Sequence, residues 1–105
     1  MSEIDNLLSL LDKGHDNALL RFSLGNAYLK NGSCELASEN FSKAITFDPE
    51  YSAAWKLYAR ALDKCGETEK AIRAYHQGIK VAENKGDIQA AKEMRVFLNR
   101  LTGKL

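Results

Sequence analysis

The sequence predicts an all-α protein built of antiparallel helical hairpins, and three observations lead to this fold class. Ala, Glu, Lys, Leu and Arg together account for 50 of the 105 residues, a level typical of extended helical arrays. Val, Ile and Thr number only ten, and no segment alternates apolar and polar residues as a half-buried strand does. Apolar residues instead recur at helical spacing in six segments, and the short connections between them favour antiparallel neighbours.

The first two helices have recognisable boundaries. Ser2 and Asp5 form the pattern of a capping box, with Asp in place of the usual Glu, ahead of an apolar series at helical spacing. The second helix starts after Asp16 or Asn17, either of which can cap it. Its end is predicted at Gly32, because glycine tolerates the left-handed conformation that terminates helices.

The remaining four helices are delimited by serine, proline and glycine. Ser33 is placed to cap the third helix, and Pro49 closes it because proline disfavours helical geometry in the residue before it. The fourth helix ends at Gly66, and the fifth begins near Thr68. Gly86 separates the fifth helix from the sixth.

The chain matches itself at an offset of 34 residues, which indicates a stacked array of hairpins and not a closed bundle. Small residues recur where two helices must approach closely, and an aromatic residue recurs where space between hairpins must be filled. The matched pairs are Gly25/Ala59, Ala27/Ala61, Gly32/Gly66, Ala37/Ala71, Phe41/Tyr75 and Ile45/Ile79.

With these residues, segments 18–51 and 52–85 resemble two consecutive tetratricopeptide (TPR) repeats. The signature positions of the first are Leu24, Gly25, Tyr28, Ala37, Phe41, Ala44 and Pro49, and those of the second are Trp55, Tyr58, Ala59, Leu62, Ala71, Tyr75 and Gly78. Arg21 stands at the Trp position of the first repeat, and Glu83 replaces the closing proline of the second. The resemblance implies a short right-handed solenoid whose concave groove binds peptides.

We therefore expect residues 1–105 to form one domain with a cover at each end. A repeat buries its apolar face only against a neighbour, so a capping helix is expected over 2–13 and another over 87–101. Residues 1–17 carry a net charge of −3 and residues 85–105 a net charge of +3. These charges either face solvent or attract each other between molecules and favour head-to-tail association.

No pattern in the sequence indicates catalysis, a cofactor or a metal. Phosphate-cradling glycine motifs, zinc-binding histidine pairs and nucleophile elbows are missing. His15 and His76 each lack a second histidine at helical spacing, so both are expected to be solvent-facing or locally hydrogen-bonded. Cys34 and Cys65 lie 31 residues apart without a CxxC pair and are expected to be small packing residues. The sequence predicts a protein that is not an enzyme.

Charge and hydropathy exclude two further classes of partner. A net charge of +1 argues against nucleic-acid binding, including RNA binding by a related helical-repeat design. No apolar run approaches the ~20 residues that a membrane-spanning helix needs. The acidic start, MSEIDNLL, lacks the basic region of a signal peptide, so a cytoplasmic location is expected.

The concave face of the first helix of each repeat is the candidate binding groove. It is predicted to be apolar in its first half and basic in its second, which suits a peptide with apolar and acidic residues. Its residues are Leu19, Phe22, Asn26, Leu29 and Lys30 in the first repeat and Lys56, Arg60, Asp63 and Lys64 in the second. Alternatively, the N-terminal helix folds over Leu19 and Phe22 and leaves a smaller groove.

Similarity to one subclass of the family is incomplete. TPR domains that clamp a terminal carboxylate use lysine, asparagine and arginine residues, of which only Asn26 is matched here. Phe22 and Leu57 stand where a lysine and an asparagine would be. The predicted function is that of a protein–protein interaction module or adaptor, monomeric or weakly self-associating. The alternative is a structural or assembly protein that acts by homo-oligomerisation.

Overall fold

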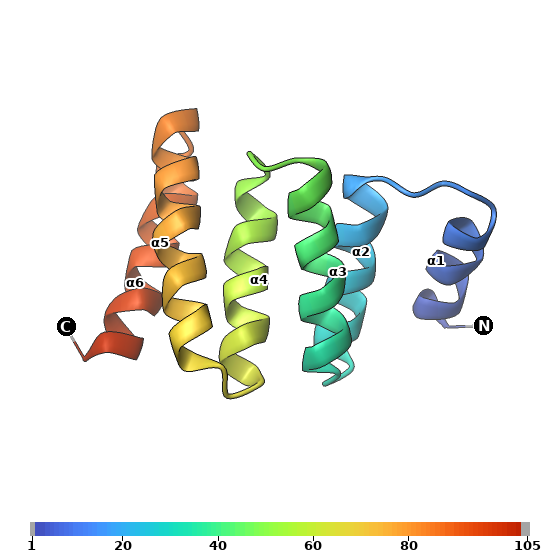
Figure 1. The fold of residues 1–105 in the computed structure, drawn as a ribbon, viewed down its shortest axis with the longest axis horizontal. Coiled ribbons are helices and arrows are strands. Elements are labelled where there is room, and N and C mark those ends of the chain that lie inside the picture. Colours follow the sequence, from blue (N-terminus) through green and yellow to red (C-terminus); the bar gives the residue numbers. More distant parts are fainter. Residues whose placement is uncertain (1, 104–105) are drawn as a thin grey trace.

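The computed structural model describes residues 2–103, which contain six α-helices and no strand, so the predicted all-α helical repeat fold is confirmed. The helices lie side by side in chain order, from α1 at one end to α5 and α6 at the other (Figure 1). Their bounds are α1 Glu3–Asp12, α2 Ala18–Lys30, α3 Cys34–Phe47, α4 Ser52–Lys64, α5 Thr68–Lys85 and α6 Ile88–Thr102.

Helices that follow one another in the chain pack against one another. The most extensive packing occurs within the hairpins α2/α3 and α4/α5, then between α5 and α6, and α3 joins the two hairpins by packing on α4. Helix α1 contacts only α2. Because most contacts run between neighbours in sequence, with smaller ones between α2 and α4 and between α4 and α6, each hairpin depends on the next one to cover its apolar face.

The helix starts agree with the three predicted caps, two of which make side-chain capping hydrogen bonds. The Asp5 amide donates to the Ser2 hydroxyl at 3.1 Å, and the Leu20 amide donates to the Asn17 side chain at 2.8 Å. Asn17 is therefore the cap of α2. Ser33 is the N-cap residue of α3, as predicted, and its carbonyl accepts the first helical bond from the Ala37 amide, but its side chain makes no capping hydrogen bond.

Two glycines inside helices allow backbones to approach closely. A Cβ atom on Gly25 would lie 2.7 Å from ring atoms of Phe41, which itself is fully buried. A Cβ atom on Gly78 would lie 2.6 Å from the Met94 sulfur and 2.9 Å from the Trp55 Cβ. The expectation that small residues let the helices approach is thus confirmed at Gly25, and Ala37 and Ala71, at two other positions expected to be small, are fully buried.

The core is divided unequally along the array. Its largest cluster is contributed by α4, α5 and α6, and it includes Tyr75 and Met94. Two clusters of three buried residues each join α3 to α4: one consists of Ala37, Phe41 and Ala61, and the other of Ala44, Ile45 and Ala54. The C-terminal half consequently holds most of the buried apolar surface, whereas the junction between the hairpins is narrow.

Candidate functional site

The candidate site lies between the first helix of the second hairpin, α4, and the final helix, α6. These two helices are in contact, and a pocket of about 250 Å³ opens between their C-terminal halves. We call it the α4–α6 pocket. It is lined by Arg60, Asp63, Lys64, Phe97, Arg100 and Leu101. Three of the residues predicted for the groove are therefore brought together, and α6 supplies the other half of the lining.

The Phe97 ring organises the cations of this pocket. The guanidinium carbons of Arg60 and Arg100 lie 5.7 Å and 5.6 Å from the centre of the ring, within the range of cation–π attraction. The ring itself stacks on the buried Tyr75 ring, with centroids 6.0 Å apart. Stacking on Tyr75 thus positions the Phe97 ring, and the ring attracts two exposed guanidinium groups.

The electrostatics of the α4–α6 pocket are dominated by positive charge. Arg60, Lys64 and Arg100 face a single acidic lining residue, Asp63. None of the ion pairs between residues 2 and 103 includes Arg60 or Arg100. Burial, with a smaller contribution from Asp63, raises the pKa of Tyr75 to about 12, and Arg60 opposes this shift. Both charges therefore act on the same buried ring.

Lys56, also predicted for the groove, forms a salt bridge within the protein. Its ammonium donates to the Glu93 carboxylate at 3.2 Å and so links α4 to α6. The salt bridge is partly exposed, so its contribution to stability is small. Its effect is to neutralise one of the cations predicted for the groove, whereas Arg60 and Lys64 of the α4–α6 pocket take part in none of the ion pairs between residues 2 and 103.

In the first half of the predicted groove, two apolar residues pack against the second hairpin. Phe22 stacks on Tyr51 with ring centroids 4.9 Å apart and lies 5.8 Å from Phe41. Leu29 packs on the cluster that contains Phe41 and Ala61. Considered within a single hairpin, these side chains had no place to be buried, but the neighbouring hairpin supplies one. Of the two polar groove residues on α2, Asn26 is partly buried and Lys30 is exposed.

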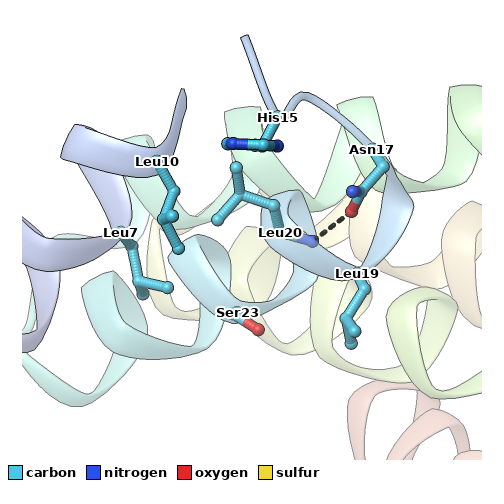
Figure 2. A pocket seen from close by; sticks show the side chains of 7 residues that line it. All are labelled: Leu7, Leu10, His15, Asn17, Leu19, Leu20 and Ser23. Atoms are coloured by element: carbon cyan, nitrogen blue, oxygen red, sulfur yellow. Dashed lines mark hydrogen bonds between the residues drawn. The ribbon is translucent and has the colours of Figure 1, made fainter. Parts of the chain in front are cut away.

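Leu19 belongs to a different surface, between α1 and α2. A pocket of about 330 Å³ there, which we call the α1–α2 pocket, is mostly apolar. Its lining comprises Leu7, Leu10, His15, Asn17, Leu19, Leu20 and Ser23. Figure 2 shows Leu10 next to Leu20, whereas the Leu19 side chain points away from both, and it is 66% exposed. Helix α1 therefore lies beside α2 without covering Leu19.

The expected role of the cysteines is wrong. Cys34 and Cys65 are joined by a disulfide, and within residues 2–103 neither is a free thiol. The sequence did contain a signal, because the two residues flank corresponding turns of successive repeats. Stacking with a 34-residue period places such turns next to each other.

Three residues that line the candidate site were missed by sequence reasoning: Phe97, Arg100 and Leu101 of α6. They recur at helical spacing, and an aromatic residue three positions before an arginine is a visible pattern. The segment carries no repeat signature, however, so it was interpreted as a cover. Its role in the pocket follows only from the packing of α6 against α4.

The part of the chain that the structure describes offers neither a metal site nor a membrane span. Within residues 2–103, no group of His, Cys, Asp or Glu side chains is placed to hold a metal ion. No helix in that range combines the length and the apolar character that a bilayer span requires.

Comparison with known proteins agrees with the architecture. The TPR repeat-containing protein PA0015 of Pseudomonas aeruginosa is 47% identical over 98 residues, which cover 93% of each chain. The solution structure of protein BPP2914 from Bordetella parapertussis superimposes with a TM-score of 0.87 at 36% identity, covering 99% of this chain and 90% of that one. A tetratricopeptide repeat domain protein from Salinibacter ruber has a TM-score of 0.77 over 84% and 98% of the two chains, and at 24% identity it supports the fold alone.

The family assignment rests on these relatives and on a direct match. A family model described as tetratricopeptide repeat matches residues 28–94, which run from the end of α2 to the first half of α6. The match extends beyond the two segments that carry the signature residues. The chain therefore belongs to the tetratricopeptide repeat family.

Proposed function

We propose that the protein is a non-catalytic adaptor that binds a peptide segment of a partner protein at the α4–α6 pocket and the adjoining concave face. The fold supports the broader part of this proposal, because stacked helical repeats present concave surfaces suited to protein–protein interaction. The observation that carries the finer part is the pair of exposed guanidinium groups at Phe97, neither of which is ion-paired within residues 2–103.

The chemistry of the α4–α6 pocket defines its ligand. A guanidinium group recognises a carboxylate through two parallel hydrogen bonds, so two such groups favour an acidic side chain. Phe97 and Leu101 offer apolar surface beside them. A volume of about 250 Å³ suits one or two side chains of a peptide. We infer a peptide in which acidic and apolar residues are adjacent.

Removing both guanidinium groups is expected to weaken peptide binding at least about tenfold, because each hydrogen bond to a charged group contributes ~1.5–3 kcal/mol. The test compares wild type with the double variant Arg60→Ala, Arg100→Ala on an array of labelled peptides that pair Asp or Glu with Leu or Phe. Arrays with Asn and Gln in place of the acids show whether charge matters. Fluorescence anisotropy then quantifies the best binders.

Arg73→Ala is the matched control, because Arg73 is an exposed arginine on α5 that lines a different surface pocket. It should leave the affinity unchanged. The proposal fails if peptides bind the double variant as tightly as wild type, or if Arg73→Ala is the change that abolishes binding. Amide shift mapping that locates the peptides on α3 and α5 alone would also contradict it.

Assembly by self-association is a second candidate, favoured by the opposite charges of the two ends and by the apolar α1–α2 pocket. Leu10 and Leu19 remain 43% and 66% exposed there, and Ile88 of α6 is 63% exposed. A head-to-tail contact of unlike surfaces can extend without closing.

Such association should weaken as salt screens the charged ends, over a Debye length of about 10 Å at 0.1 M. Sedimentation velocity at several protein concentrations, at low and high salt, measures it, and Leu19→Asp should reduce it further. A monomer under all conditions excludes this candidate. Neither candidate function depends on the cellular compartment, so the cytoplasmic location stays a prediction. The disulfide argues against it, because such bonds persist mainly in oxidising compartments.

A further inference from the structure

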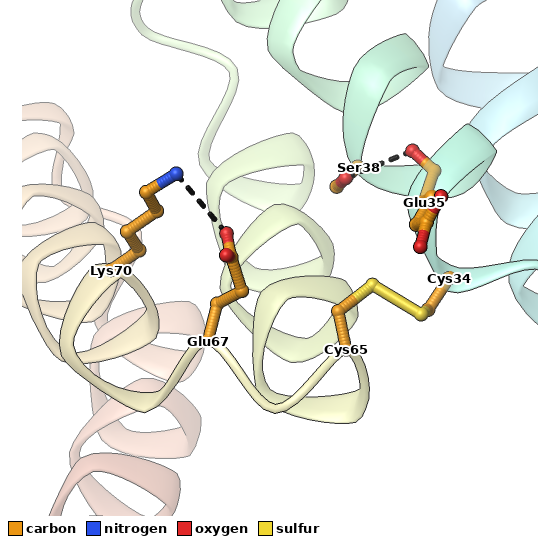
Figure 3. The surroundings of a disulfide bond; sticks show 6 residues. All are labelled: Cys34, Glu35, Ser38, Cys65, Glu67 and Lys70. Atoms are coloured by element: carbon orange, nitrogen blue, oxygen red, sulfur yellow. Dashed lines mark hydrogen bonds and ion pairs between the residues drawn. A yellow bond between two sulfur atoms is a disulfide. The ribbon is translucent and has the colours of Figure 1, made fainter.

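The disulfide ties together two turns that belong to different repeats. Cys34 is the first residue of α3, and Cys65 caps the end of α4 (Figure 3). Their Cα atoms are 5.5 Å apart, a common separation for bonded cysteines. The bond therefore joins the α2–α3 turn of the first hairpin to the α4–α5 turn of the second.

The junction that the disulfide crosses has a smaller buried core than the C-terminal half of the array. Helix α3 packs on α4, but α3 and α5 are not in contact. The buried apolar residues of the junction are the two clusters of three described above. Partly buried side chains pack against these clusters: Phe22, Tyr28, Leu29, Tyr51, Trp55, Leu57 and Tyr58. In an array of repeats, a weak interface between neighbours lets one part open while the other stays folded.

We propose that Cys34 and Cys65 form a reversible redox staple at this junction. In the oxidised protein the staple couples the two halves of the array, α1–α3 and α4–α6. In the reduced protein the N-terminal half opens separately from the C-terminal half, which keeps the largest core cluster. The inference concerns the stability of the junction and is independent of peptide binding.

Glutathione is the small thiol that reduces the disulfide in this proposal. A glutathione thiolate attacks one sulfur of the Cys34–Cys65 bond, which breaks, and its electron pair leaves on the other cysteine as a thiolate that takes up a proton. A second glutathione thiolate then attacks the glutathione sulfur of the mixed disulfide and releases the remaining cysteine. Two cysteine thiols and one glutathione disulfide result, and oxidation is the reverse of these steps.

The surroundings of the disulfide permit this exchange. Both cysteines are only partly buried, and a pocket of about 260 Å³ lined by residues 32–36 opens beside Cys34. The exposed carboxylates of Glu35 and Glu67 flank the bond, and Lys70 pairs with Glu67 at 3.2 Å (Figure 3). A small thiol therefore has direct access from solvent.

The test places the full chain in glutathione buffers of different ratio and measures intact mass, thermal unfolding and amide hydrogen exchange. Oxidation should lower the intact mass by about 2 Da, as the loss of two hydrogens requires. Closing a loop of this length should raise Tm by about 10 °C. On reduction, exchange across α2 and α3 should accelerate at least about tenfold, whereas α5 and the core side of α6 retain their protection.

The double variant Cys34→Ser, Cys65→Ser is the matched control and should behave as reduced wild type in every buffer, which separates loss of the bond from effects of the reagent. Free thiols that persist under oxidising glutathione would overturn the proposal. So would an unchanged Tm, or a loss of protection of equal size in both halves, because either shows that the bond does not couple the two halves.

Discussion

Replacing Phe41 with alanine is expected to lower the free energy of unfolding by about 3–5 kcal/mol, as truncation of a fully buried aromatic ring does. The ring is 0% exposed and lies over the backbone of Gly25, closer than any side chain there would permit. It also contacts Phe22 and packs with Ala61 of α4. Its removal opens a cavity where the first hairpin meets the second, at the narrowest part of the core.

Phe47→Ala provides the matched control, because Phe47 lies on the same helix and is 53% exposed. Its loss should cost less than about 1 kcal/mol. Urea unfolding of the oxidised protein, followed by circular dichroism, measures both changes, provided that the dependence of the free energy of unfolding on urea concentration is the same for both variants. Equal losses for the two variants would show that the junction does not depend on the Phe41 ring.

The repeat architecture was predictable because its determinants are local. Glycines at the helix ends adopt the left-handed conformation that stops a helix, as Gly32 and Gly66 do with φ near 80°. The small residues at Gly25 and Ala59 recur with a fixed period because the same close approach recurs in each hairpin. A periodic pattern repeats one packing solution, and the sequence shows it directly.

Features that depend on contact between repeats were harder to predict. Phe22 looked like free groove surface because its own hairpin has no room for it, yet the next hairpin supplies Tyr51 as a partner. Cys34 and Cys65 looked unrelated because their separation of 31 residues has no meaning along a single helix. Each requires knowledge of which helix lies beside which, and that depends on the stacking of whole hairpins.

Only half of the candidate site could be predicted, because its other half depends on contact between different parts of the array. Arg60, Asp63 and Lys64 follow from the helical spacing of α4, and the structure gathers them in one pocket. Phe97 and Arg100 come from a helix without signature residues, whose packing was not specified by the repeat pattern. The pocket exists because α6 docks on α4 and α5 as a third repeat would, although its sequence departs from the signature.

Met94→Ala tests whether α6 is a removable cover or part of the core, and we expect a loss of about 2–5 kcal/mol in the free energy of unfolding. Met94 is 0% exposed, and its sulfur lies where Gly78 leaves space against α5. Val96→Ala, on the same helix at a position 48% exposed, should cost less than about 1 kcal/mol. Urea unfolding measures both variants, and a loss below about 1 kcal/mol for Met94→Ala would contradict a core role for α6. Because Phe97 and Arg100 are held by the same helix, the measured loss also indicates how firmly the α4–α6 pocket is assembled.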